Sequence, residues 1–533
     1  MKINLVVAIL FVFNIGQSIA QNKITAEVPA QYSNPVLHAD YSDPDAIRVG
    51  NTYIMTASSF TCTPGLPILT SHDLVHWTIS GYALKKLVPD DYYQTVRHGG
   101  GVWAPSIRYH NNEFFIYYPD PDFGIYMVHA KSYLGPWSDP VLVQAGKGLI
   151  DPCPFWDDNG KAYLVHAYAG SRAGIKSIIS IKQMNAEGTK VTDEGRIVYD
   201  GHGVDPTVEG PKIYKRNGFF YIFVPAGGVG TGWQTVLCSK NIYGPFERKV
   251  VMAQGGSSIN GPHQGAWVQT PEGKDWFLHF QDKEAYGRVV HLQPMIWKNN
   301  WPVIGEDKDG DGTGEPFMNY GNKDTGYHQL LTQVKSSQFS GHAPLGADWQ
   351  WQANAAIEWY FLHDQQLRLY ARTLVDAAKN KYDLPNLLMQ KFPALRFEAT
   401  TKLEADKLNN GEEAGMMVFG TDYAWLGVQR RDDKFYLVQS VCLNADKGNA
   451  EKMTILDTLS STSKLVTLKI VVGQGATVRF NYSWDGSNFM ETKLPFTAKP
   501  GKWVGAKMGL FASGSKRTND CGSADFDFFE VKY

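Results

Sequence analysis

Residues 42–58 read SDPDAIRVGNTYIMTAS, and the pattern of this stretch recurs four more times along the chain. Each copy has a polar or aromatic residue, a small residue or proline, a short strand, a tight polar turn and a strongly apolar strand. The copies lie about 47 to 61 residues apart, which leaves room for four short strands per unit and is typical of propeller blades. The sequence therefore predicts a five-bladed β-propeller over residues 30–320, and neither the helices nor the shorter period of a solenoid is visible. The other copies are WAPSIRYHNNEFFIYY (103–118), IDPCPFWDDNGKAYLVHAY (150–168), EGPKIYKRNGFFYIFV (209–224) and QGAWVQTPEGKDWFLHF (264–280).

From about residue 335 the rhythm changes to alternating strands of similar length, such as LRLYARTL, LRFEATTKL and ADFDFFEVKY. Their spacing predicts an antiparallel β-sandwich over residues 335–533. A short helix at Leu384–Gln390 is the alternative at one point of this half. The fold class is therefore all-β, a propeller followed by a sandwich, with a Gly/Asp-rich linker at residues 305–326.

Composition limits the partners of this chain. Its 533 residues carry 51 Lys+Arg against 53 Asp+Glu, without a basic stripe, so nucleic acid is not an expected partner. The 27 Tyr, 27 Phe and 15 Trp supply flat apolar surfaces of the kind that stack on sugar rings. No phosphate-binding loop or dinucleotide fingerprint is present, so no organic cofactor is expected.

The N-terminus has the pattern of a signal peptide over residues 1–20. Lys2 supplies the positive start, residues 5–12 form an apolar run, and Ser18-Ile19-Ala20 is a small-residue cleavage site. A membrane anchor, the alternative, needs about 20 apolar residues, and this run is shorter. We expect an exported protein, periplasmic or secreted, with no transmembrane segment in the mature chain.

Five cysteines are an odd and sparse set, with neither the spacing of a zinc site nor that of a disulfide framework. One bridge, between Cys442 and Cys521, and a full set of free buried thiols are the two alternatives. The cysteines are Cys62, Cys153, Cys238, Cys442 and Cys521.

Three carboxylates occupy matching places in the repeat. Asp43 and Asp151 directly precede the proline of their units, and Glu209 lies one residue earlier in its own. Because the first strand of each blade lines the propeller axis, these side chains should face one funnel. An aspartate before proline is commonly only a turn residue. Three acids at matching positions are better explained by function, because clustered like charges repel and cost desolvation.

A pair of carboxyl groups across a sugar is what glycoside hydrolysis requires. One donates a proton to the leaving oxygen, and the other activates water or attacks. A third carboxylate nearby favours the protonated form of the acid and orients it.

The stretches NPVLHADYSDPDAIRVGNTYIMTASSF (34–60), GVWAPSIRYHNNEFFIYY (101–118), IDPCPFWDDNGKAYLVHAY and VEGPKIYKRNGFFYIF (208–223) resemble glycoside hydrolase family 43. This family contains five-bladed β-xylosidases, α-L-arabinofuranosidases and arabinanases. The second half, through LGADWQWQANAAIEWYFL (345–362) and SADFDFFEVKY (523–533), resembles the β-sandwich of its β-xylosidase-type members.

The resemblance implies a role for each acid in an inverting reaction. Asp43 matches the general base, Glu209 the general acid, and Asp151 the residue that tunes and positions the acid. Asp45, two residues from Asp43, is the alternative base.

The resemblance also implies substrate-binding residues. Trp103 is expected to wall or stack on the sugar, with an ordinary packed Trp as the alternative. Arg288 matches an arginine aimed at sugar hydroxyls, with a surface charge as the alternative. Phe60 is expected at the pocket wall, with core packing as the alternative.

His263 matches a histidine at the family's propeller axis, where a hydrated calcium ion is held; a hydrogen-bonded core histidine is the alternative. One nitrogen is an unusual ligand set for calcium, which prefers several oxygens. Asp307, Asp309 and Asp311 begin like an EF-hand loop, but Met318 stands where its bidentate Glu is expected. We interpret that loop as a solvated acidic turn.

The resemblance implies an exo-acting inverting glycosidase that removes terminal α-L-arabinofuranosyl residues from plant cell-wall polysaccharide or oligosaccharides. A β-xylosidase on xylo-oligosaccharides is the close alternative, and an endo-arabinanase is disfavoured because the appended sandwich narrows a groove into a pocket. A non-catalytic carbohydrate-binding propeller is the alternative of a different class, and it would lack one of the three acids.

Overall fold

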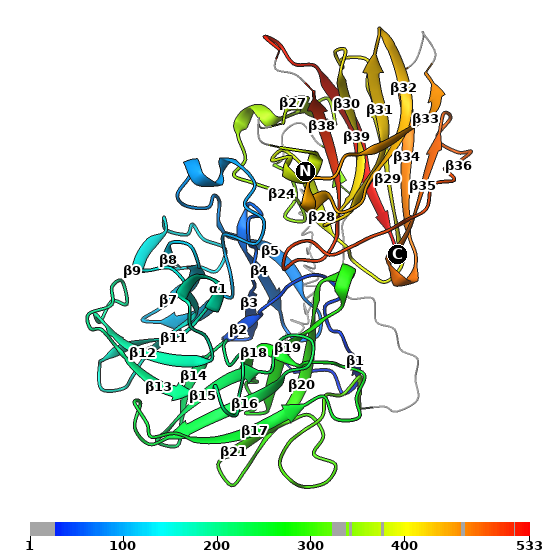
Figure 1. The fold of residues 1–533 in the computed structure, drawn as a ribbon. Coiled ribbons are helices and arrows are strands. Elements are labelled where there is room, and N and C mark those ends of the chain that lie inside the picture. Colours follow the sequence, from blue (N-terminus) through cyan, green and yellow to red (C-terminus); the bar gives the residue numbers. More distant parts are fainter. Residues whose placement is uncertain (1–26, 322–336, 340–343, 375–377, 460–463, 516–517) are drawn as a thin grey trace, which may run out of the picture.

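The structure, a computed structural model, describes residues 27–321, 337–339, 344–374, 378–459, 464–515 and 518–533. The predicted signal peptide and the last five residues of the predicted linker, 322–326, lie outside these residues. The described residues form an all-β propeller followed by a β-sandwich, as predicted (Figure 1).

Five four-stranded antiparallel sheets form the blades, and in each sheet the strands follow in chain order. The first strands, β2, β6, β10, β14 and β18, are those of the five sequence repeats. The blades are β2 (Asp45–Val49), β3 (Thr52–Thr56), β4 (Gly65–Ser71) and β5 (Thr78–Leu84); β6 (Ser106–His110), β7 (Glu113–Asp120), β8 (Gly124–Ala130) and β9 (Val141–Ala145); β10 (Leu149–Trp156), β11 (Ala162–Tyr168), β12 (Ile178–Met184) and β13 (Arg196–Asp200); β14 (Lys212–Arg216), β15 (Phe219–Ala226), β16 (Trp233–Ser239) and β17 (Glu247–Ala253); and β18 (His263–Gln269), β19 (Asp275–Asp282), β20 (Arg288–Lys298) and β21 (Trp301–Ile304).

The predicted hairpin turns join the first two strands of their blades. Asn217 and Gly218, between β14 and β15, have φ values of 50° and 77°. A turn with positive φ at both central residues matches the twist of the flanking strands, and Asn-Gly adopts it with little strain.

Residues that precede the first blade join it to the last. β1 (Tyr32–Ser33) pairs with β22 (Asn319–Tyr320). The buried Asn34 side chain donates to Leu292 O (2.9 Å) and Phe317 O (2.8 Å) and accepts from Leu292 N (2.8 Å). These bonds close the ring without sharing a strand between blades.

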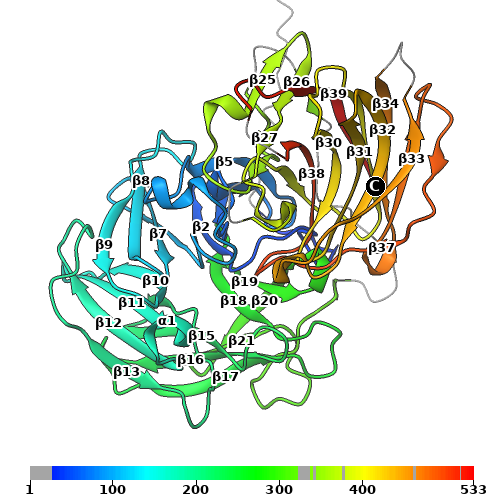
Figure 2. The ribbon, with the colours of Figure 1, turned by 45° about the horizontal axis from the view of Figure 1, so that its top comes forward.

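The second half is a sandwich of two sheets, which packs beside the propeller in both views (Figures 1 and 2). One pairing in it, β27 with β38, is parallel, and the other pairings are antiparallel. The first sheet contains β23 (Ser337–Gln338), β25 (Tyr360–His363), β26 (Gln366–Tyr370), β29 (Phe397–Glu404), β34 (Leu465–Val472), β35 (Thr477–Ser483), β36 (Met490–Glu491), β37 (Phe496–Thr497) and β39 (Ser523–Lys532). The second contains β24 (Gln350–Trp351), β27 (Arg372–Thr373), β28 (Leu388–Lys391), β30 (Glu412–Phe419), β31 (Tyr423–Arg431), β32 (Lys434–Cys442), β33 (Lys452–Thr458) and β38 (Lys507–Gly514).

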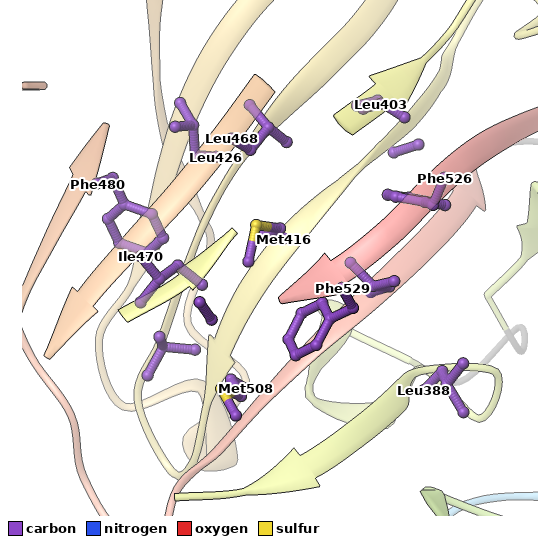
Figure 3. Close-up of a cluster of buried hydrophobic side chains, with 14 of the residues drawn as sticks. Leu388, Leu403, Met416, Leu426, Leu468, Ile470, Phe480, Met508, Phe526 and Phe529 are labelled. Atoms are coloured by element: carbon purple, nitrogen blue, oxygen red, sulfur yellow. The ribbon is translucent and has the colours of Figure 1, made fainter. Parts of the chain in front are cut away.

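The core of the sandwich lies between these sheets. In β29, buried and half-buried residues alternate strictly, which is the pattern of a strand with one face in a core. Figure 3 shows Phe480, Phe526 and Phe529 of the first sheet among Met416 and Met508 of the second. Because successive side chains of a strand point to opposite faces of its sheet, this pattern places the apolar side chains of the two sheets against each other.

In the described residues, helical structure is confined to single turns. The alternative of a helix at Leu384–Gln390 is wrong, because this stretch connects a 3₁₀ turn to β28. The helical turns are α1 (Gly170–Ala173), η1 (Asp91–Gln94), η2 (Glu284–Tyr286), η3 (Ile357–Trp359), η4 (Lys381–Asp383), η5 (Ala445–Lys447) and η6 (Gln474–Ala476). Among the described residues, no helix has the length and apolar character needed to cross a membrane.

All five cysteines lie in the described part of the chain, and none is in a disulfide. Four are buried, and Cys521 is half-buried. The alternative of a Cys442–Cys521 bridge is therefore wrong, and the thiols are free.

The sandwich docks on the first blade through buried polar contacts. Asn354 donates to Leu87 O (2.9 Å) and Asp90 Oδ1 (2.8 Å) and accepts from Leu87 N (2.8 Å). Thr63 and Trp351 form an isolated β-bridge between the domains. A second contact involves the turn after β19, where Ala506 N donates to Ala285 O (2.7 Å).

Candidate active site

A pocket lies at one end of the propeller axis, and its volume is about 130 Å³. It gathers all seven residues that the sequence assigned to catalysis, sugar binding and the axis. Its walls are formed by Asp43, Phe60, Trp103, Ala104, Ile150, Asp151, Glu209, Val229, His263, Gln264, Arg288 and Trp503.

Left-handed backbone at or just before the first strands turns the acids toward this pocket. Asp43 and Asp151 have φ values of 56° and 55°, in the left-handed region. Gly210, next to Glu209, has a φ of 60° at the corresponding place in its blade. Left-handed backbone is costly for residues other than glycine, and such positions cluster at functional sites.

Asp43 is held by two partners. It is 5% exposed, accepts a 2.5 Å hydrogen bond from Ser58 Oγ, and lies 3.5 Å from Arg288 Nη1. These two contacts fix the orientation of the Asp43 carboxyl group.

Asp45, the alternative base, lies outside the pocket. It is fully buried, and its Oδ2 accepts from Arg108 Nη1 (2.6 Å) and Ile107 N (2.8 Å). These bonds join the first blade to the second. They hold Asp45 in the interior, away from the pocket, so it has no access to a substrate.

Asp151 and Glu209 come from neighbouring blades. Asp151 accepts from Gly210 N (2.7 Å) and from Gln264 Nε2 (3.4 Å). Burial, and then the charge of Glu209, raise the pKa of Asp151 well above its usual range. Glu209 Oε1 lies 2.9 Å from His263 Nε2, and its side chain is 24% exposed, so it can reach a substrate.

Aromatic rings form the walls of the pocket. The Phe60 and Trp103 rings lie 6.5 Å apart, and Trp103 Nε1 donates to Gly99 O (2.9 Å). The Trp103 ring also meets the edge of Trp503 at 6.3 Å. Trp503 belongs to the sandwich and was not anticipated from the sequence, because only the docking of the two domains brings it here.

Arg288 also lines the pocket. It is 9% exposed, so the alternative of a surface charge is wrong. Its guanidinium lies 5.0 Å from the centroid of the Phe280 ring and 5.9 Å from that of Trp503. Arg288 thus links Asp43 to the aromatic side chain supplied by the sandwich.

His263 is a buried partner of the acid. Its Nε2 faces Glu209, and its Nδ1 is buried without a hydrogen-bond partner in the structure. The neighbouring described residues offer no set of oxygen ligands of the kind calcium takes. They do not form a calcium site by themselves, and no step below depends on calcium. Among the described residues, the acidic group close enough to hold a cation is the turn at residues 307–311.

Comparisons with known proteins agree with this architecture. Residues 32–302 match the family described as "Glycosyl hydrolases family 43", and residues 336–532 match the "Beta xylosidase C-terminal Concanavalin A-like domain". The chain is 36% identical over 487 residues to a candidate β-xylosidase of Xylanibacter ruminicola, covering 90% of this chain and 86% of that protein. It is 26% identical to a non-reducing end α-L-arabinofuranosidase of Bacteroides ovatus, covering 94% of each. The solved xylan β-1,4-xylosidase of Bacillus halodurans has the same fold, with a TM-score of 0.81 at 23% identity, covering 94% of this chain and 100% of that one.

Proposed function

The chain belongs to glycosyl hydrolase family 43, and we propose that it is an exo-acting, inverting glycosidase that releases single terminal pentosyl residues. The observation that carries this proposal is the convergence of Asp43, Asp151 and Glu209 in one pocket, with Trp503 in its wall. A non-catalytic sugar-binding propeller would have no use for three acids gathered in one pocket, because clustered like charges cost desolvation.

In this proposal Asp43 is the general base. Its contacts with Ser58 and Arg288 fix its orientation. A water between Asp43 and the anomeric carbon would lose a proton to Asp43 as it attacks.

Glu209 is the general acid of the same step. It protonates the glycosidic oxygen as the bond to the anomeric carbon breaks, so the leaving alcohol departs neutral. Asp151 accepts the backbone N–H of Gly210, the residue after Glu209, and so positions the acid. His263 holds the Glu209 carboxyl group from the other side.

The dimensions of the pocket support exo action. A cavity of about 130 Å³ is small, as expected for a site that takes one sugar ring rather than a chain. The Trp503 and Trp103 rings contact each other in the wall of the pocket. In an endo-acting enzyme, an open groove would continue at this place.

For the sugar, we propose a β-D-xylosyl residue first and an α-L-arabinofuranosyl residue second. The sequence analysis ranked these sugars in the opposite order. The relative of higher identity, at 36%, is the candidate β-xylosidase, and the arabinofuranosidase is at 26%. We also propose that the chain is exported, because plant polysaccharide lies outside the cell; N-terminal sequencing of the mature protein from fractionated cells would test cleavage after Ala20.

The test is hydrolysis of aryl β-D-xyloside and aryl α-L-arabinofuranoside, with the first product followed by proton NMR. We expect xylose to appear first as the α-anomer, because inversion changes the configuration. Asp43→Asn should abolish turnover of both substrates, whereas Asp139→Asn, at an exposed site on the second blade, should not. Activity of Asp43→Asn equal to that of the parent, or a first product with retained configuration, would contradict the proposal.

A further inference from the structure

A buried lysine lies beneath the acids. Lys212, in β14, is 1% exposed, and its Nζ donates to Pro105 O (2.8 Å) and Ser106 Oγ (2.7 Å). Both acceptors are neutral, and no carboxylate oxygen of the described residues lies within 4.0 Å of this Nζ. A buried ammonium group without a paired carboxylate is costly, so the burial of Lys212 needs a physical explanation.

The path of the Lys212 side chain explains its burial. Lys212 belongs to the fourth blade, and its two acceptors begin the first strand of the second blade. The first strand of the third blade, β10, contacts both of these strands and carries Asp151. To connect the fourth blade with the second, the Lys212 side chain must therefore cross β10 in the neighbourhood of Asp151.

Backbone contacts on both sides of Lys212 confirm this placement. Gly210 N, two residues before it, donates to Asp151 Oδ2 (2.7 Å). Ile213 N, the next residue, donates to Cys153 Sγ (3.4 Å). β14 thus runs along the part of β10 that bears the carboxylate.

The other cations at the axis already have carboxylate partners. Arg108 pairs with Asp45 (2.6 Å), and Arg288 lies 3.5 Å from Asp43. The remaining charged or titratable groups around the acids are Glu209 and His263, which bind each other, together with Cys153 and Tyr214, which lie by Arg108. Asp151 receives hydrogen bonds only from neutral groups in the described residues, so Lys212 is the cation left to balance its charge. Burial and Glu209 raise the pKa of Asp151, and the Gly210 bond and the Lys212 charge oppose that rise.

We infer that Lys212 is a positioning residue for the proposed reaction: it ties the fourth blade to the second beneath Asp151 and supplies the buried positive charge that stabilises that carboxylate. The inference rests on the proposed function. It assigns to the protein a cation that acts from behind the acids, without touching the substrate.

The test compares Lys212→Gln with the parent in the pH dependence of kcat/KM on an activated aryl glycoside. Glutamine can still donate to Pro105 O and Ser106 Oγ but has no charge. Removing the positive charge of Lys212 favours protonation of the nearby carboxylates. The acidic limb of the pH profile of kcat/KM should therefore move to higher pH by about one unit. Ser106→Ala, which removes one acceptor and keeps the charge, should leave this limb in place.

Several outcomes would overturn the inference. One is a folded Lys212→Gln protein with the parent's acidic limb, and another is an equal shift in Ser106→Ala. If Lys212→Gln does not fold, Lys212→Met takes its place, and failure of both to fold would assign Lys212 to the fold alone. The titration of ¹³C-labelled aspartate side chains by NMR, with Asp151→Asn for assignment, gives the same comparison without turnover. A parent that cleaves neither glycoside would contradict the proposed function, while the NMR titration would still decide the role of Lys212.

Discussion

Replacing the acid, Glu209→Gln, separates proton donation from every other role of this side chain. Glutamine has nearly the same shape and can still contact His263 Nε2, which lies 2.9 Å from Glu209 Oε1. The Glu209 side chain is 24% exposed, so the substitution buries no new polar group and should leave the fold intact.

The size of the effect should depend on the leaving group. A positioned general acid contributes about 10²- to 10⁴-fold, which is about 3–5 kcal/mol at 1.36 kcal/mol per tenfold. An alcohol leaving from an oligosaccharide needs that proton, so we expect a loss in this range. A dinitrophenolate leaves without protonation, so the loss on that glycoside should be about tenfold or less.

The assay is kcat/KM on xylo-oligosaccharide and on dinitrophenyl β-xyloside for the parent, Glu209→Gln and Glu247→Gln. Glu247 is an exposed glutamate of the same blade, so its substitution makes the same chemical change away from the pocket. Equal losses on both substrates, or parental activity of Glu209→Gln on the oligosaccharide, would show that Glu209 is not the acid.

Three other predictions concern the walls, the domain contact and acid stability. Trp503→Ala should raise KM about sixfold and leave kcat near the parental value in steady-state assays, because losing about 50 Å² of ring contact at about 25 cal/mol per Å² costs about 1 kcal/mol. Asn354→Ala should lower the free energy of unfolding in urea by about 2 kcal/mol, because it leaves the buried N–H and C=O of Leu87 unpaired. For Asp525, burial acts to raise the pKa, but the hydrogen bonds from Arg368 (2.7 and 2.8 Å) hold it below the usual range. The stabilisation that Asp525 gives the folded state is therefore present above about pH 4, and it is lost as pH falls through the folded-state pKa. Asp525→Asn should therefore cost about 3 kcal/mol at neutral pH and progressively less toward pH 3, measured by denaturant unfolding; a cost independent of pH would refute this linkage.

Much of the fold could be predicted because local signals repeat. Each first strand follows a proline or small residue and ends in a polar turn, and five copies of this pattern identify five blades. The antiparallel sandwich could be read from alternation such as that of β29. The short parallel pairing of β27 with β38 carried no such signal, because it spans two residues and depends on tertiary packing.

A site residue could be predicted only where its position in the repeat determines which way its side chain points. Asp43 and Asp45 are two residues apart, and in a regular strand they would share a face. The left-handed backbone at Asp43 breaks that alternation and separates their surroundings, so one lines the pocket and the other pairs with Arg108. Lys212 has no signal in the sequence, since a lysine in a strand is ordinarily a surface residue.

One buried carboxylate, Asp40, connects Arg288 to the sandwich. Asp40 is 4% exposed, and its Oδ1 accepts from Arg288 N (2.9 Å) while its Oδ2 accepts from Gly505 N (2.9 Å). Arg288 contacts the base, and Gly505 follows Trp503 by two residues, so this side chain fixes both walls of the pocket relative to each other. Because each oxygen of Asp40 has its own partner, a shift of the sandwich would strain the backbone that carries Arg288. The position of Trp503, and with it the difference between a pocket and a groove, is therefore coupled to the base through buried hydrogen bonds rather than through the substrate.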